Sequence, residues 1–277
     1  MAKTKRRYNP SDLISNILLY LFAAAMIFPF IWLVSTSLKL PQHILSWPPQ
    51  IFPKVFTLAN YQAVFQKVDM IRYFINTLRF TMVSTMSIVF TSALVGYVFA
   101  KYRFPFKEPM FLIIISTMMI PFQCYMIPLY MMMVKIHAVD TYLGLQLPYL
   151  VQAMGTFFMR QNFESLPDEY LDAARIEGAS EWRIFFNIAL PSFRSALGGL
   201  SIFVVSIIWG NLIWPLIITS SEKNFVLELG LVNFQQLYTV DYGLFTAAAT
   251  VAIIPVIIFF IVFRRQIMEG ITLSGIK

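Results

Sequence analysis

The most restrictive feature of this sequence is a series of long apolar stretches, each close to the length that crosses a lipid bilayer. A hydrocarbon core of about 30 Å requires roughly 20 apolar residues in an α-helix. Every backbone polar group inside a bilayer must be hydrogen-bonded within the protein, so such stretches are predicted to be helices. Six stretches qualify, at residues 13–38, 73–100, 110–134, 142–159, 192–218 and 243–263.

Composition supports the same class of protein. Of the 277 residues, 58% are hydrophobic and 13% are charged, whereas soluble domains carry about 25% charged residues. The aromatic content of 16% also excludes a disordered chain, because disorder goes with few aromatic residues and much charge. We therefore expect an all-α integral membrane protein with six transmembrane helices.

Lysine and arginine residues predict which side of the membrane each connection faces. With the N-terminal tail 1–12 placed inside, the inner connections carry fourteen lysines and arginines and the outer ones carry six, with Arg79 near the outer end of its span. Cytoplasmic connections are enriched in these residues. Both termini are therefore expected in the cytoplasm, with 13–277 forming one transmembrane domain.

The outer connection 39–72 contains several prolines, which favour extended backbone. After them an apolar residue recurs at helical spacing, at Leu58, Tyr61, Phe65 and Val68. This spacing predicts a short amphipathic helix at the outer surface.

The cytoplasmic connection 160–191 differs from an ordinary loop, because it holds six of the chain's 14 acidic residues. Ser165 is positioned to cap a first helix, with Asp168 near its positive end. Gly178 is placed to end that helix in a left-handed conformation, and Ser180 can cap a second helix. Pro191 then separates the second helix from the next span. The pattern predicts a helix–turn–helix.

Several chemistries lack the residues that they require. The sequence holds no G-x-x-x-x-G-K-[ST] phosphate loop, no G-x-S-x-G and no H-E-x-x-H, so neither ATP hydrolysis nor another catalytic activity is expected of this chain. One cysteine and two histidines far apart in sequence argue against a metal site. The inner thirds of the six spans hold no charged residue or histidine, which weighs against a proton-coupled transporter.

Neutral polar residues do occur in the spans. Gln123, Gln152 and Asn211 suit contacts with an uncharged, polyhydroxylated solute along a pathway. The alternative is that such amides join neighbouring helices. In the same part of the chain, Pro121 and Pro128 each remove a helix hydrogen bond and permit a kink.

The cytoplasmic connection also carries a recognisable motif. It reads Asp172-Ala173-Ala174, then Gly178, then Ile188-Ala189-Leu190-Pro191. This resembles the E-A-A…G…I-x-L-P loop of permease subunits in binding-protein-dependent ABC importers, with Asp172 where the family favours glutamate. Small alanines let a helix sit closely in a groove, and the glycine supplies a tight turn.

Further stretches narrow the resemblance to carbohydrate importers, and to the smaller permease of maltose-type systems. They are Asn76-Thr77, Gly96-Tyr97-Val98-Phe99-Ala100, Ile120-Pro121-Phe122-Gln123, Ile127-Pro128-Leu129-Tyr130, Asn211-Leu212-Ile213-Trp214-Pro215-Leu216 and the tail that begins at Glu269.

The resemblance implies a type I ABC importer permease fold in a bacterial or archaeal plasma membrane. Its partners would be a second permease subunit, two ATP-binding subunits and an extracytoplasmic solute-binding protein, besides a sugar substrate and membrane lipid but no nucleic acid. ATP and Mg would bind on the partner ATPase subunits, so no cofactor is expected on this chain. The implied ATPase-coupling residues are Asp172, Ala173, Ala174, Gly178, Ile188, Leu190 and Pro191.

The outer segment 219–242 resembles the loop that reaches into the binding protein, with Gln235, Gln236 and Tyr238 as the implied contacts. Two alternatives stay open: a permease for another solute, such as a polyol or glycerol phosphate, and a stand-alone secondary transporter or channel. An intramembrane enzyme ranks last. The acidic connection 160–191 favours the importer, because an uncoupled carrier has no need of a docking segment.

Overall fold

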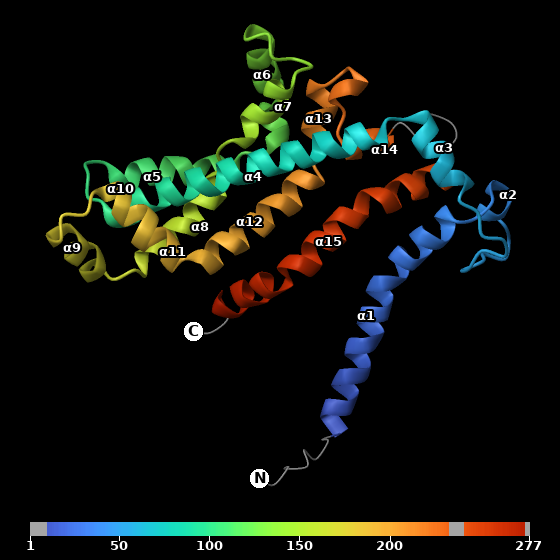
Figure 1. The fold of residues 1–277 in the computed structure, drawn as a ribbon, viewed down its shortest axis with the longest axis horizontal. Coiled ribbons are helices and arrows are strands. Elements are labelled where there is room, and N and C mark those ends of the chain that lie inside the picture. Colours follow the sequence, from blue (N-terminus) through green and yellow to red (C-terminus); the bar gives the residue numbers. More distant parts are fainter. Residues whose placement is uncertain (1–9, 233–240, 275–277) are drawn as a thin grey trace. The chain divides into compact units, whose positions relative to one another are not determined.

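Three long helices dominate the fold: α1 (Pro10–Ser37), α4 (Met70–Lys101) and α15 (Tyr242–Ser274) (Figure 1). The computed structural model describes residues 10–232 and 241–274, with side chains for 13–232 and 241–263. Each long helix is apolar and long enough to cross a membrane, close to a stretch expected from the sequence. The elements in these described ranges are all helical.

The stretch 110–134 forms a sharply bent pair of helices instead of one span. It contains α5 (Lys107–Ser116), continued by the short η1 (Thr117–Met119), and α6 (Phe122–Lys135), with a bend of 101° between them. Pro121 takes the extended backbone conformation that precedes α6, with φ −57° and ψ 140°. The proline lacks the N–H that a continuous helix would use.

The stretch 142–159 is also interrupted. It contains α7 (Tyr142–Gln146), η2 (Leu147–Tyr149) and α8 (Ala153–Glu164). Pro148 lies in the first turn of η2, and three non-helical residues follow the turn.

The third interrupted stretch, 192–218, forms α12 (Arg194–Trp209) and α13 (Ile213–Ile218), and a bend of 78° precedes α12. The expected single helices over these three stretches are thus replaced by broken ones. Within the described part of the chain, three helices could cross a membrane by themselves, or up to five if each bent pair is one span.

The chain divides into two compact units, one formed by residues 1–69 and 231–253 and the other by 70–230 and 254–277. In the first unit, the connection after α1 contains α2 (Pro41–Ile44) and α3 (Ala59–Lys67). Lys39 is only 1% exposed, and its Nζ donates to the carbonyl oxygen of Gln50 at 2.5 Å and lies 4.4 Å from the centre of the Trp32 ring. These contacts hold the proline-containing loop against the end of α1.

Helix α3 confirms the short helix expected here, but the face expected to be apolar is not the buried one. Leu58 and Phe65 are exposed, whereas Asn60 and Val64 are buried. Asn60 is buried because its Nδ2 donates to the carbonyl oxygens of Ser37 and Lys39, both at 2.9 Å. Hydrogen bonding to irregular backbone, which hydrophobic periodicity does not report, sets the orientation of this helix.

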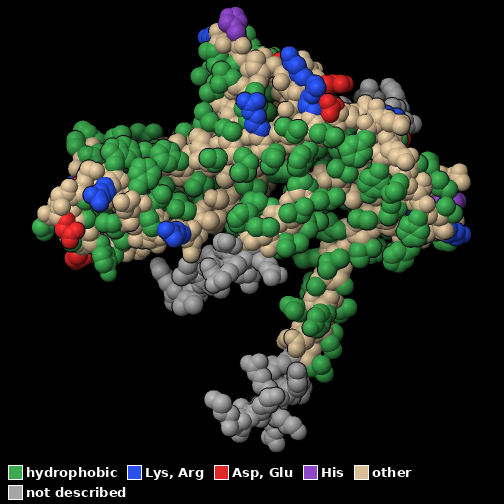
Figure 2. Space-filling view, in the orientation of Figure 1, with side chains coloured by type: hydrophobic (Ala, Val, Ile, Leu, Met, Phe, Trp, Pro, Cys, Tyr) green, Lys and Arg blue, Asp and Glu red, His purple; other side chains and the backbone are tan. Residues whose placement is uncertain are grey.

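The second unit is built around α4, which packs along α8 and α12 (Figure 1). Small residues allow a close approach of α4 to α8: a Cβ added to Gly96 would lie 2.8 Å from the Cβ of Met159, and one added to Gly155 would lie 2.3 Å from the Ser92 Oγ. Such contacts are typical of helices packed in membranes. Figure 2 shows hydrophobic side chains along the visible length of α4, with acidic side chains gathered at the α9 end and beside α13.

The remaining helices of this unit form its two ends. They are α9 (Asp168–Ile176), α10 (Glu181–Ile184), the π-helical turn η3 (Phe185–Ala189), α11 (Leu190–Ser192), η4 (Glu222–Asn224) and the start of α14 (Leu227–Val232).

Candidate functional site

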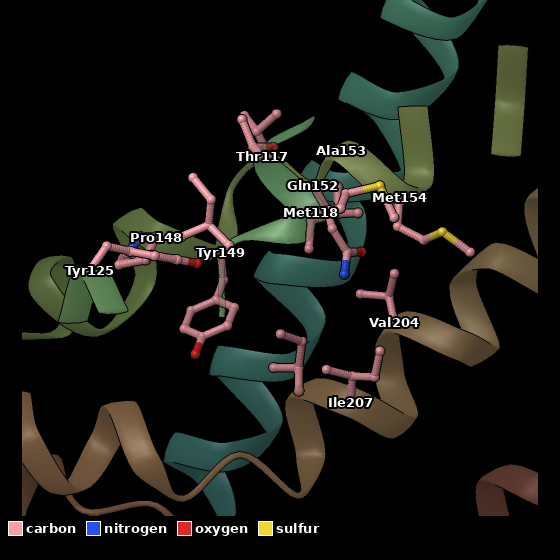
Figure 3. A pocket seen from close by; sticks show the side chains of 14 residues that line it. Thr117, Met118, Tyr125, Pro148, Tyr149, Gln152, Ala153, Met154, Val204 and Ile207 are labelled. Atoms are coloured by element: carbon pink, nitrogen blue, oxygen red, sulfur yellow. The ribbon is translucent and has the colours of Figure 1, made fainter. Parts of the chain in front are cut away.

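A cavity of about 610 Å³ lies in the second unit, where the helices of the bent stretches are interrupted (Figure 3). Ile120 belongs to the break before α6, and Val151 and Gln152 belong to the break before α8. Inside a membrane, non-helical backbone is tolerated only where protein buries it or where it lines a cavity. Interrupted helices of this kind form the solute sites of many transporters. The volume falls in the range of small-molecule sites.

The cavity wall is mostly apolar and carries a few polar groups. Figure 3 shows the Gln152 amide directed into the space bordered by Val204 and Ile207. The Gln152 Oε1 is buried and has no hydrogen-bond partner among the described residues. A buried acceptor left unpaired costs about 1–3 kcal/mol, so a hydroxyl-bearing solute that donates to this oxygen would be favoured here.

Tyr149 contributes a second polar group to the cavity. The Asn211 Nδ2 donates to the Tyr149 hydroxyl, and the Tyr149 ring packs edge-on against Phe80 with ring centres 5.3 Å apart. A hydroxyl fixed in this way on an aromatic ring presents both a polar and a flat apolar surface to a solute.

At one end of α4 the chain forms a two-helix segment (residues 165–190), which contains α9, α10 and η3. It is called the coupling segment after the role that the motif's resemblance implies. Gly178 has φ +80°, which confirms the left-handed turn expected between the two helices. The Ser180 Oγ accepts from the backbone N–H of Arg183 at 3.4 Å, which confirms the second cap. Ser165 does not cap α9: Pro167 occupies that position, and the Ser165 Oγ donates to the carbonyl oxygen of Asn162 at 2.7 Å.

Pro191 does not separate the second helix from the following span as expected. It lies inside α11, and the chain bends two residues later, at Phe193. Helical structure is continuous from Glu181 to Ser192, with the π-helical turn directly before Leu190, so Pro191 removes one intrahelical hydrogen bond near the end of this helix.

An ion-pair network holds the two helices of the coupling segment together. The Arg175 Nε donates to Glu181 Oε1 and its Nη1 donates to Asp172 Oδ1, both at 2.9 Å. The Tyr102 hydroxyl, just after α4, also donates to Glu181. Hydrogen bonds from Arg175 and from Tyr102 hold the pKa of the Glu181 carboxyl below its usual range, so this acid is ionised at neutral pH.

Comparison with known proteins places this arrangement in a family. Residues 92–270 match the profile described as the binding-protein-dependent transport system inner membrane component. The chain belongs to this family. The resemblance drawn from the motif between Asp172 and Pro191 is thereby confirmed.

Two relatives match this permease over nearly its whole length. It is 33% identical to the arabinooligosaccharides transport system permease protein AraQ of Bacillus subtilis, over 98% of this chain and 99% of AraQ. It is 31% identical to the lactose transport system permease protein LacG of Rhizobium radiobacter, over 100% of both chains.

A solved structure shares the fold of this permease. It is the crystal structure of a bacterial ABC transporter involved in the import of the acidic polysaccharide alginate, with a TM-score of 0.83 and 21% identity, over 94% of this chain and 99% of that one. The permease therefore has the all-helical fold of type I ABC importers, as the sequence predicted.

The structure separates the three candidate pathway residues. Gln152 lines the cavity, and Asn211 positions Tyr149 beside it. Gln123 is exposed on α6 and is not among the cavity-lining residues. Sequence reasoning missed Tyr149, although Pro148 beside it is a helix-breaking signal like the one at Pro121.

The structure also divides the motif residues of the permease by exposure. Asp172, Ala173 and Gly178 are exposed. Ala174 is 8% exposed, and Ile188 and Leu190 pack against the core of the second unit, with Pro191 partly buried beside them. One group of motif residues is thus available to a partner, while the other attaches the coupling segment to the membrane helices.

The expected binding-protein contacts Gln235, Gln236 and Tyr238 lie outside the described residues. The described part of that connection, residues 219–227, is called the outer segment after its expected side of the membrane. It is fixed by Asp140, whose Oδ1 accepts from the backbone N–H groups of Ser220 and Ser221 at 2.9 and 3.0 Å. Burial would raise the pKa of Asp140, but hydrogen bonds from Ser221, Ser220 and Asn224 outweigh it and hold the pKa well below its usual range. Among residues 10–232 and 241–274, no group of three His, Cys, Asp or Glu could hold a metal ion.

Proposed function

We propose that this chain is a membrane-spanning permease subunit of an ATP-driven oligosaccharide importer and forms half of its translocation pathway. The observation that carries the proposal is the cavity at the helix breaks, with its buried, unpaired Gln152 Oε1. A neutral acceptor beside Tyr149 suits sugar hydroxyls, and none of the described side chains that line this cavity is charged. The relatives AraQ and LacG, which are named as permeases of arabinooligosaccharide and lactose transport systems, support the same solute class.

In this proposal the chain crosses a bacterial or archaeal plasma membrane six times, with both termini in the cytoplasm. The bent and interrupted helices would supply the spans that single helices do not. The excess of lysine and arginine in the inner connections supports this orientation.

The complex would contain a second permease, two ATP-binding subunits and an extracytoplasmic solute-binding protein. ATP and Mg would be held by the ATP-binding subunits. The exposed Asp172, Ala173 and Gly178 would face them, with Ala174, Ile188, Leu190 and Pro191 supporting the coupling segment from behind. The segment with Gln235, Gln236 and Tyr238 would contact the binding protein.

Uptake by the reconstituted complex tests this function. Proteoliposomes that contain both permeases, the ATPase and the binding protein are given a labelled arabinooligosaccharide, lactose or glycerol 3-phosphate, with either internal ATP or an imposed pH gradient. We expect uptake of a neutral oligosaccharide with ATP alone. Uptake driven by the pH gradient would favour a secondary transporter, and uptake of glycerol 3-phosphate in place of the sugars would favour the alternative solute class.

A further inference from the structure

Helix α4 connects the coupling segment to the outer segment, and it does so without an interruption. It runs for 32 residues from Met70 to Lys101 and contains no proline. The other two long helices in the described part of the chain each contain one, Pro29 in α1 and Pro255 in α15. Sharp kinks arise at proline, at Gly/Ser pairs, at π-bulges or where a side chain or water enters the helix hydrogen bonds. Since α4 is one continuous α-helix without proline, it is the long helix best suited to move as a rigid body.

One end of α4 is attached to the coupling segment at two points. The Lys101 side chain is 6% exposed, and its Nζ donates to Asp168 Oδ1 at 2.8 Å and to the carbonyl oxygen of Leu166. Tyr102 donates to Glu181 on the other side of the Gly178 turn. The contacts with Lys101 and Tyr102 therefore lie on opposite sides of the exposed motif residues.

The other end of α4 is attached to the outer segment in a similar way. The Asn76 Nδ2 donates to the carbonyl oxygens of Lys223 and Phe225, both at 2.9 Å. The Thr77 Oγ1 accepts from the backbone N–H of Leu227 at 2.8 Å. At 1.5 Å per residue, about 36 Å of helix separate Thr77 from Lys101, which exceeds the roughly 30 Å of a bilayer core.

We propose that α4 acts as a rigid connecting rod between the two faces of the permease. In this role Lys101 and Tyr102 transmit movement of the coupling segment, and Asn76 and Thr77 transmit movement of the outer segment. The inference rests on the proposed importer function and adds the positioning residues that connect the ATPase side to the binding-protein side. Rigid elements with attachments at both ends are a physical route for coupling between distant sites.

Stimulation of ATP hydrolysis by the solute-loaded binding protein measures this coupling, because the signal must cross the membrane. Lys101→Met removes the ammonium group and keeps most of the buried stem, and Lys101→Arg keeps a donor. We expect Lys101→Met to leave basal hydrolysis unchanged, to reduce the stimulation about tenfold, within the range of couplings between two sites, and to reduce solute imported per ATP. Lys101→Arg should retain most of the stimulation and most of the solute imported per ATP.

Matched controls distinguish the loss of an attachment of α4 from a general effect of changing a charge or disturbing the fold. Arg103→Met makes the same charge change at an exposed position two residues further on. At the outer end, Asn76→Leu removes the donor, whereas Lys223→Met leaves the backbone carbonyl that Asn76 contacts. We expect only Asn76→Leu and Lys101→Met to lose stimulation. If Lys101→Met does not assemble, Tyr102→Phe and Asp168→Asn, which each remove one contact at the inner end, take its place.

A double-variant cycle gives the decisive result. If one rod connects both ends, breaking the second attachment after the first has little further effect. The double variant Asn76→Leu with Lys101→Met should therefore lose no more stimulation of ATP hydrolysis than the single variant with the larger loss. Independent, additive losses would overturn the proposal, as would wild-type stimulation in the single variants or an equal loss in Arg103→Met. A wild-type complex without ATP-driven uptake would instead contradict the proposed function.

Discussion

At the scale of single residues, glycines show what the sequence reveals and what it does not. Gly178 stands between two helix-forming stretches and follows a basic residue, Arg175, in the last turn of the first one, so its left-handed turn could be predicted. The close approach at Gly96 and Gly155 could not, because the atoms that exclude a side chain there, in Met159 and Ser92, come from another helix.

Gly178→Val should impair coupling through backbone strain alone. No atom lies within 4 Å of a Cβ added at this position, so the cost arises from φ +80°, about 1–2 kcal/mol for a residue with a side chain. We expect normal membrane abundance with reduced uptake and reduced binding-protein-stimulated ATP hydrolysis. Gly178→Asn should retain more activity, since asparagine adopts this conformation more readily.

The control for this change is Gly199 in α12. An added Cβ there also meets no atom within 4 Å, but the backbone is helical. Gly199→Ala should therefore transport at the wild-type rate. Wild-type coupling in Gly178→Val would show that the turn has no part in docking.

At the scale of helices, the length of an apolar stretch predicts that helical structure forms there better than it predicts that the helix is unbroken. The unbroken helix α4 was found close to its expected bounds because its hydrophobic run has no breaker. The runs 110–134 and 142–159 are also apolar, but Pro121 lies in the break before α6 and Pro148 lies in the first turn of η2. Whether a proline breaks a helix, as Pro121 does, or sits inside one, as Pro128 does in α6, depends on tertiary contacts that lie outside its local sequence.

The cavity formed by these breaks distinguishes two glutamines that the sequence could not separate. Gln152→Leu should raise the KM for solute uptake about tenfold, because the loss of one buried hydrogen bond is worth about 1–1.5 kcal/mol. Gln123→Leu is the matched control, with the same chemical change at an exposed position outside the cavity. Initial uptake rates over a range of solute concentrations provide the measurement. Equal effects of the two variants on the KM would show that the cavity is not part of the solute pathway.

At the scale of the whole molecule, the proposed orientation in the membrane rests on the distribution of lysine and arginine in the sequence and not on the fold. Single cysteines in a Cys124→Ser background, labelled in intact cells with an impermeant thiol reagent, measure it directly. We expect labelling at Gln50 and Ser221 and none at Lys5 or Lys277, because lysine and arginine are concentrated on the side assigned to the cytoplasm. The reverse labelling pattern would overturn the assigned orientation.

The unburied surface of helix α1 affects how the chain enters the membrane during its synthesis. None of its most apolar window is buried inside the described part of the chain, so its surface is left to lipid or to another subunit. A helix that satisfies its own backbone hydrogen bonds is stable in a bilayer without neighbours. Because the ribosome makes α1 before the helices that follow it, α1 can enter the membrane before any of them exists. The contacts that bury Ser37, at the end of α1, and Lys39 just after it come from Gln50 and Asn60, so this end of the helix can pack only after those later residues have also left the ribosome.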